Sequence, residues 1–285
     1  MLTAYFDESY NQPTLKEPDL PLVYTVAGYL SSSEQWTAFE KEWRKALSVA
    51  DIPFFHMTDF ESRVGVYKNW ENDQRIEFLQ TLHRIIHKYV LKGFATSIVI
   101  ADYEKLTPFQ KERVFGEPHM AALFDCLKKI YKICEEIDIH QPIAYVFEKN
   151  REYDSKITQA FYDMPEDAKI GYRVGSLSFT EKDCGPVNAA DILAYEVTKA
   201  KANQLKAEGQ RRPERRSILN LAVSQIDEWF YMDSNEFEIA LGHMKRLGTY
   251  DESMEDGYVT TPKAQPPRGK EFARFEEASR KKDVQ

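Results

Sequence analysis

Carboxylic acids that end apolar stretches are the residues of this chain best suited to chemistry. Asp7 and Glu8 follow the apolar run 2–6 and precede Ser9, and Glu148 ends a later apolar run. A strand that closes into a polar loop would give the same pattern without any chemical role. If these acids instead meet at one edge of a sheet, their like charges require a cation between them.

A third acid, Asp191, lies near the predicted start of a helix. Pro186 and Asn188 are typical of a helix start, so Asp191 falls in or near the first turn. Because Asp191 follows Asn188 by three residues, it could simply complete a capping arrangement. Alternatively, a helix that starts at the edge of a sheet would carry Asp191 toward the other acids.

Apolar periodicity predicts an α/β fold that could bring the three acids together. The predicted strands are residues 2–6, 22–30, 94–101, 142–150 and 172–182. The predicted helices are residues 31–50, 72–93, 119–137, 157–164, 187–205, 218–232 and 234–247. The first three strands can form an antiparallel meander, and the last two can add in parallel through right-handed crossovers, with the first strand central. Asp7 and Glu148 would then end neighbouring strands.

One domain is expected over residues 1–250. It contains a helical insertion at about 32–92, after the second strand, and a helical C-terminal extension at about 217–248. The last segment, 251–285, combines several prolines with many charges, which predicts a loose charged tail. The hydrophobic content of 42% over 285 residues is enough for a substantial core.

The bulk composition argues against several classes of protein. There is no run of eighteen or more apolar residues and no readable secretory signal, so we expect a soluble, cytoplasmic protein without a membrane partner. The three cysteines have no C-x-x-C spacing, which suits reduced thiols and argues against structural zinc. The net charge of −8 argues against nonspecific coating of nucleic acid, but it leaves room for a local basic surface beside an acidic cleft.

Three short motifs occur in the order found in a known family. They are “AYFDESYNQ” at residues 4–12, “FFHMTDFE” at 54–61 and “NAADILAYE” at 188–196. With these motifs the chain resembles, over roughly its first two hundred residues, the family catalogued as domain of unknown function 3800. That family is generally placed in the ribonuclease H-like superfamily. Tyr10 departs from the glycine that usually follows the D-E-S triplet, so the loop at the site could differ in shape.

The resemblance implies a ribonuclease H-like mixed sheet of five strands and a metal-dependent nuclease. Asp7, Glu148 and Asp191 would be the catalytic residues and would hold two Mg²⁺ or Mn²⁺ ions. Two such ions roughly 3.5–4 Å apart stabilise both the attacking water and the leaving oxygen during hydrolysis of a phosphodiester. Glu8 could be a fourth metal ligand or could point away, because neighbouring residues of a strand face opposite sides of a sheet.

Further residues could line the cleft of such a site. His56, Asp59 and Glu61 would lie at its mouth, with Ser9 and Asn188 close to the acids. His56 follows two aromatic residues, so a hydrogen-bonded histidine in the cleft wall is the simpler interpretation of it. Asn188 stands near the alanine–aspartate pair, where family members often carry asparagine or glutamine, with one extra alanine between.

A basic stretch follows the helix that carries Asp191. Its residues Arg211, Arg212, Arg215 and Arg216 could contact the phosphates of DNA or RNA. A solvated helix end explains them equally well, since the helix dipole favours cations near a C-terminus. The preferred function is a nuclease, and the alternative is a catalytically silent scaffold or partner-binding protein with the same fold.

Overall fold

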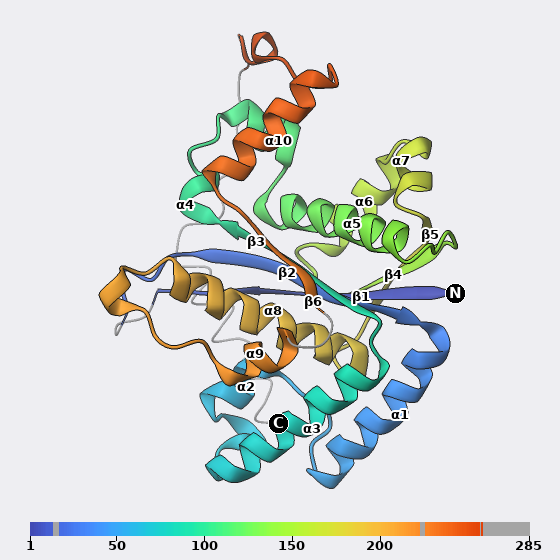
Figure 1. Cartoon of the computed structure of the whole chain (residues 1–285), viewed down its shortest axis with the longest axis vertical. Helices are drawn as coiled ribbons and strands as arrows, with labels where there is room; N and C mark the ends of the chain where they lie inside the picture. Colours follow the sequence, from blue (N-terminus) through green and yellow to red (C-terminus); the bar gives the residue numbers. More distant parts are fainter. Residues whose placement is uncertain (14–16, 223–225, 257, 259–285) are drawn as a thin grey trace.

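The computed structural model describes residues 1–13, 17–222, 226–256 and 258, which form a six-stranded mixed sheet covered by helices (Figure 1). The strand order is β5-β4-β1-β2-β3-β6, so β1 lies in the middle of the sheet. The strands are β1 (Leu2–Tyr10), β2 (Val23–Ser32), β3 (Lys92–Val99), β4 (Ile143–Glu148), β5 (Val174–Thr180) and β6 (Ile226–Met232).

The directions of the first five strands match the predicted topology. β1, β2 and β3 form an antiparallel meander, and β4 and β5 add in parallel on the other side of β1. Gly28 of β2 faces Phe6 of β1 in this register. A side chain at Gly28 would place its Cβ 2.1 Å from the carbonyl oxygen of Tyr5 and 2.7 Å from the ring of Phe94, so only glycine fits there.

The helices divide between the two faces of the sheet. The helical segments are α1 (Ser33–Val49), α2 (Met57–Ser62), α3 (Asn72–Tyr89), α4 (Ile100–Tyr103), α5 (Pro118–Glu136), α6 (Asp154–Asp163), α7 (Glu166–Gly171), α8 (Gly185–Gln204), α9 (Arg216–Ala222) and α10 (Ser234–Arg246). Figure 1 shows α1, α3 and α8 on one face and α5 on the other. Between β2 and β3, where a helical insertion was predicted, the chain forms α1, α2 and α3.

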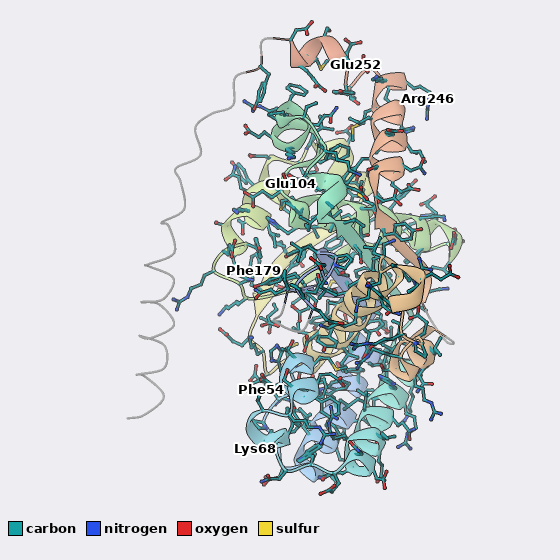
Figure 2. All side chains as sticks on the ribbon, turned by 90° about the vertical axis from the view of Figure 1, so that its left-hand side faces the viewer. Phe54, Lys68, Glu104, Phe179, Arg246 and Glu252 are labelled. Atoms are coloured by element: carbon teal, nitrogen blue, oxygen red, sulfur yellow. The ribbon has the colours of Figure 1, made fainter. Side chains whose placement is uncertain are left out.

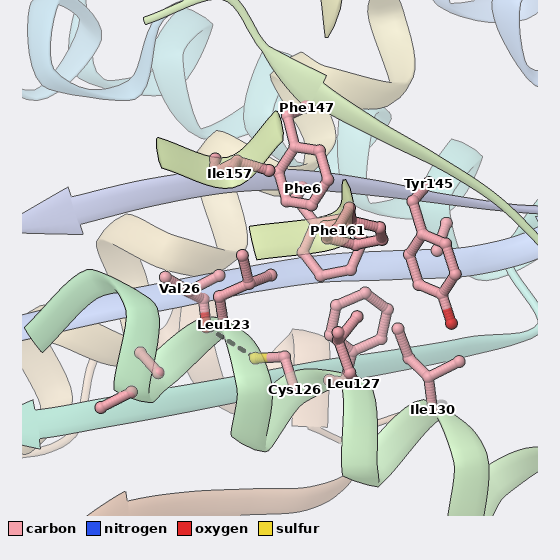
Figure 3. Packing of buried hydrophobic residues seen from close by; sticks show 14 of the residues in the cluster. Phe6, Val26, Leu123, Cys126, Leu127, Ile130, Tyr145, Phe147, Ile157 and Phe161 are labelled. Atoms are coloured by element: carbon pink, nitrogen blue, oxygen red, sulfur yellow. Dashed lines mark hydrogen bonds between the residues drawn. The ribbon is translucent and has the colours of Figure 1, made fainter. Parts of the chain in front are cut away.

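Each face of the sheet carries its own apolar cluster. On the α5 face, Phe6 stacks on Phe147 with ring centroids 4.5 Å apart, and Cys126 of α5 donates to the carbonyl of Val26 (Figure 3). On the other face, Phe39 stacks on Trp43 of the same helix with centroids 5.0 Å apart. Because side chains along a strand alternate between the two clusters, the clusters determine which side of the sheet each side chain points to.

The structure corrects the prediction for residues 218–232. This stretch was expected to be one helix, but α9 ends at Ala222 and β6 begins at Ile226. β6 pairs in parallel with β3, so the sheet has six strands among the described residues instead of the expected five. The composition of β6, rich in aromatic residues, suits a strand, and the free edge of β3 supplies its backbone partners.

The predicted charged tail falls mostly outside the described residues. Its start includes a short 3₁₀ helix over Glu252–Glu255, while residues 259–285 are not described. Figure 2 shows Phe54 and Lys68 of the helical insertion near one end of the long axis, and Arg246 and Glu252 near the other. Among the described helices, none combines the length and the apolar character needed to cross a bilayer.

Candidate functional site

The register of β1 and β4 places Asp7 beside Glu148. Phe6 pairs with Phe147 in the parallel ladder, and Asp7 and Glu148 are the next residue of each strand. Both side chains therefore lie on the sheet face opposite the phenylalanines, which is the face covered by α8. Asp7 is buried, and the side chain of Glu148 is 15% exposed.

Helix α8 brings Asp191 to the same place. Cys184 is its N-cap residue and Glu40 accepts a hydrogen bond from the backbone N–H of Gly185 at 2.9 Å, so the helix begins earlier than expected. Asp191 consequently lies in the second turn, and the capping interpretation of this residue is wrong. Its Oδ2 instead accepts a hydrogen bond from the backbone N–H of Met57 at 2.6 Å.

The three acids interact electrostatically. Burial raises the pKa of Asp7 well above its ordinary value, and the charges of Asp191, Glu8 and Glu148 raise it further. Burial also raises the pKa of Asp191 to about 6, with Glu148 adding to the rise. The positive charge that His56 can carry and the N–H of Met57 act in the opposite direction. Asp7 and Asp191 are thus costly to ionise beside the other acids.

Glu8 is directed toward the opposite face of the sheet. Asn150 donates a hydrogen bond from Nδ2 to Glu8 Oε1 at 2.6 Å, and a small pocket beside Glu8 is bordered by Tyr24, His119 and Tyr153. Burial raises the pKa of Glu8 to about 7, although the hydrogen bond from Asn150 opposes the rise. Of the two roles predicted for Glu8, this placement favours a residue that points away from the other acids.

The segment around His56 closes one side of the acid cluster. His56 is the N-cap residue of α2, and its Nδ1 lies 3.0 Å from Oδ2 of Asp59. The next residue, Met57, is the one that contacts Asp191. His56 and Asp59 are partly exposed, so they border the acids from the solvent side, where the sequence placed a cleft mouth.

Asn188 ties this segment to α8. Its Oδ1 accepts from the N–H of Phe55 at 3.3 Å and from Nε1 of Trp43 at 3.4 Å, while its Nδ2 donates to the carbonyl of Lys182 at 2.7 Å. Asn188 is buried, so its contacts position the backbone around the acids. Ser9 lies on the same side, and its carbonyl accepts a hydrogen bond from Thr198 of α8 at 3.4 Å.

Lys182 belongs to the site, and sequence reasoning missed it. Its Nζ lies 3.4 Å from Oε1 of Glu148, and its side chain is 57% exposed. Although burial opposes the change, Glu148, Asp7 and Asp191 raise the pKa of Lys182. The signal that could have found it is topological, because Lys182 follows β5, the strand that pairs in parallel with β4.

Glu61 and Arg215 have ion-pair partners within the chain, and the roles predicted for them stay predictions. Arg215 forms a double hydrogen bond to Glu196 of α8, at 2.8 and 3.0 Å, and lies 3.0 Å from Glu61. Glu61 also contacts Arg75 at 3.5 Å. The predicted contacts of Arg211, Arg212 and Arg216 with nucleic acid stay predictions, and these three side chains are exposed.

The chemistry of the acids fits a hard divalent cation. Asp7, Glu148 and Asp191 supply oxygen donors alone, the kind that Mg²⁺ and Mn²⁺ prefer, and a bound cation would relieve the charge crowding of Asp7 and Asp191. As the side chains stand, no group of three or more His, Cys, Asp or Glu within the described ranges is arranged to hold a metal ion. The fit is therefore one of donor chemistry and charge.

Comparison with known proteins adds no assignment to this geometry. No family model matches the chain, and no curated protein matches it. The function proposed below therefore rests on the residues of the site and on the motifs in the sequence.

Proposed function

We propose that this chain is a nuclease that hydrolyses phosphodiester bonds of DNA or RNA with Mg²⁺ or Mn²⁺. Asp7, Glu148 and Asp191 would hold the metal. The observation that carries the proposal is the convergence of these acids from β1, β4 and α8, with Asp7 and Asp191 buried and Glu148 slightly exposed. Burial and like charge raise the pKa of Asp7 and Asp191, and a cation among them would reverse that cost.

The topology supports a ribonuclease H-like fold. An antiparallel meander of three strands, with two parallel strands added beside the first, matches the order of elements in the sequence and suits the ribonuclease H-like mixed sheet that the resemblance implied. On this proposal, β6 is an additional edge strand beside β3. The motifs shared with domain of unknown function 3800 support the same assignment, since they contribute Asp7, His56, Asn188 and Asp191.

The residues of the chain would orient the reactants and hold their charges. A bound divalent ion would neutralise charge on the phosphodiester and activate the attacking water. The N–H of Met57 fixes one oxygen of Asp191, and Asn188 holds the Phe55 backbone and the Lys182 carbonyl against α8. Lys182 places a positive charge beside Glu148 on the exposed side, where it can attract a phosphate.

Cleavage and metal binding test the proposal together. Wild type should cleave labelled single-stranded DNA, duplex DNA or RNA in Mn²⁺, and Asp191→Asn should lower the rate by about a thousandfold, the scale expected when metal catalysis is lost. Mn²⁺ at a hundredfold excess over its Kd should raise the free energy of unfolding of wild type by about 2.7 kcal/mol. In a thermal melt, Mn²⁺ should leave the melting temperature of Asp191→Asn unchanged.

A matched control is Asp138→Asn. Asp138→Asn removes the same negative charge as Asp191→Asn. The side chain of Asp138 is 94% exposed, and its backbone φ of 54° is one that asparagine readily adopts. This variant should behave as wild type in both measurements. If wild type cleaves none of the three probes and Mn²⁺ does not raise its melting temperature, the partner-binding alternative replaces the nuclease.

A further inference from the structure

A cavity of about 290 Å³ lies beside the C-terminal half of α8, away from the three acids. It is lined by Glu17, Leu20, Tyr195, Lys199, Ala200, Ala202, Asn203, Lys206, Arg212, Pro213, Glu214 and Arg215. Four of these residues are cations and two are carboxylic acids, so the lining carries a formal charge of +2. Its size is at the lower end of ligand pockets, about 300 Å³.

The cations of this cavity differ in how well they are paired. Arg215 is held by Glu196 and Glu61, as described above. Lys206 and Arg212 share one carboxylate, since both contact Oε1 of Glu17, at 2.7 and 3.0 Å. One carboxylate between two cations leaves positive charge at the cavity wall.

Lys199 has no carboxylate within ion-pair distance in the part of the chain that the structure describes. Its Nζ lies 5.3 Å from the centre of the Tyr195 ring, and the guanidinium of Arg215 lies 5.8 Å from the same centre. Burial lowers the pKa of Lys199, and Arg215 and Lys206 lower it further, against the opposing effects of Glu17 and Glu61. The cavity around Lys199 is therefore electropositive, and an anion would relieve its charge.

One helix connects this cavity to the acids. Lys199 follows Asp191 by eight residues of α8, which corresponds to about 12 Å along the helix axis. Tyr195 lies between them, and its pKa is raised to about 12 by burial, with a contribution from the charge of Asp191. With a cation at the acids, a ligand that spans both places would carry negative charge at points about 12 Å apart, as the backbone of a nucleic acid does.

We propose that this cavity binds a phosphate of the nucleic-acid backbone, next to but separate from the phosphate that is cleaved. Lys199 contacts that phosphate, and Lys206 and Arg212 border it. The inference rests on the proposed nuclease function and names a second contact point for the same substrate. In this proposal the main phosphate contact is Lys199 of α8, in place of the arginines predicted from the sequence.

The test measures binding of a labelled short oligonucleotide, single-stranded and duplex, as a function of salt, with Ca²⁺ in place of Mg²⁺ to suppress cleavage. Lys199→Gln should weaken binding about tenfold, the effect of losing one charge-assisted hydrogen bond. The slope of log affinity against log salt should flatten by about 0.7 on single strands or about 0.9 on duplex, as expected for one lost phosphate contact. Lys199→Arg should keep both the affinity and the slope.

The matched control is Lys88→Gln, which removes the same charge from α3, where Lys88 pairs with Glu42. It should leave the affinity and the slope unchanged. Mn²⁺ should still raise the melting temperature of Lys199→Gln, which shows that the fold and the acid site are intact. If wild type binds the oligonucleotide and Lys199→Gln matches Lys88→Gln, the cavity assignment is wrong while the nuclease proposal stands. If wild type binds neither form of oligonucleotide, the cavity assignment is wrong, and the cleavage and Mn²⁺ melting measurements decide the nuclease proposal separately.

Discussion

Two buried acids of α8, Asp191 and Glu196, have opposite surroundings. Burial raises the pKa of both side chains above the ordinary value. Glu196 is fully buried and is held by a double hydrogen bond from Arg215, at 2.8 and 3.0 Å. Asp191 faces other acids. Within the described residues, its side chain accepts a hydrogen bond from the N–H of Met57, and the positive charges of His56 and Lys182 act on it from farther away.

The difference separates a structural acid from a binding acid. A buried carboxylate that is paired within the chain holds two elements together, here α8 and the segment of Arg215. A buried carboxylate among like charges costs free energy in the folded state, and a cation from solution can recover that cost. Removing the charge of Glu196 or of its partner Arg215 should therefore lower the free energy of unfolding, whereas removing the charge of Asp191 should not.

The largest expected effect is on the paired acid. Arg215→Met leaves the carboxylate of Glu196 buried without its cation, and we expect a loss of about 2–4 kcal/mol in the free energy of unfolding. This loss of stability is smaller than for a fully buried ion pair, because the side chain of Arg215 is 37% exposed and solvent screens its charge. Chemical denaturation of the metal-free protein measures it.

Arg212→Met is the control for this change. Arg212 makes the same kind of contact with Glu17, but its side chain is 75% exposed, so the variant should lose less than about 1 kcal/mol. Equal losses in the two variants would contradict a structural role for the pair of Arg215 and Glu196.

The pH dependence of stability should reveal the crowded acid. The folded-state pKa of Asp191 is about 6, above its ordinary value of 3.8, so ionisation of this group favours the unfolded chain. Its contribution to stability is complete below about pH 4 and is lost as the pH rises through about 6. In EDTA, wild type should therefore lose about 1–3 kcal/mol relative to Asp191→Asn across that window. A stability difference that stays flat, or that changes in the other direction, would show that the Asp191 anion is well paired.

The smallest expected effect concerns Lys182, the cation beside Glu148. Its ammonium group competes with a divalent ion for the same carboxylate. Lys182→Gln should therefore tighten Mn²⁺ binding, by about threefold on the scale of a pair exposed to solvent, in a calorimetric titration. Lys149→Gln is the matched control, because Lys149 pairs with the exposed Glu181. Weaker Mn²⁺ binding in Lys182→Gln alone would mean that Lys182 helps to hold Glu148 in place.

Much of the sheet could be predicted from the sequence, because its strands are apolar and are bounded by turns or helices. The prediction failed at β6, where the sequence pattern over 218–232 suits a helix as well as a strand. What decides the outcome is the free edge of β3, a tertiary feature that the local pattern does not contain. The start of α8 was also placed too late, since Glu40 from a distant helix caps it.

Asp7 and Glu148 could be predicted as site residues because each ends or follows an apolar run that indicates a strand. Glu148 ends β4, and Asp7 lies within β1 one residue past the ladder that joins the two strands, so the parallel pairing makes them neighbours. The contacts of Asp191 with Met57 and of Arg215 with Glu196 join residues 134 and 19 positions apart, and no local pattern encodes them. For the same reason, the bond from Arg215 to the buried carboxylate of Glu196 was not predicted.

The most direct test of the central claim is a crystal grown with Mn²⁺ and measured near the manganese absorption edge. The account predicts an anomalous peak bordered by the carboxylates of Asp7, Glu148 and Asp191, and loss of that peak in crystals of Asp191→Asn. The crystal should be grown at a Mn²⁺ concentration that gives the full rise in melting temperature. A manganese peak elsewhere, or no peak at these acids, would contradict the claim that this cluster is a metal site.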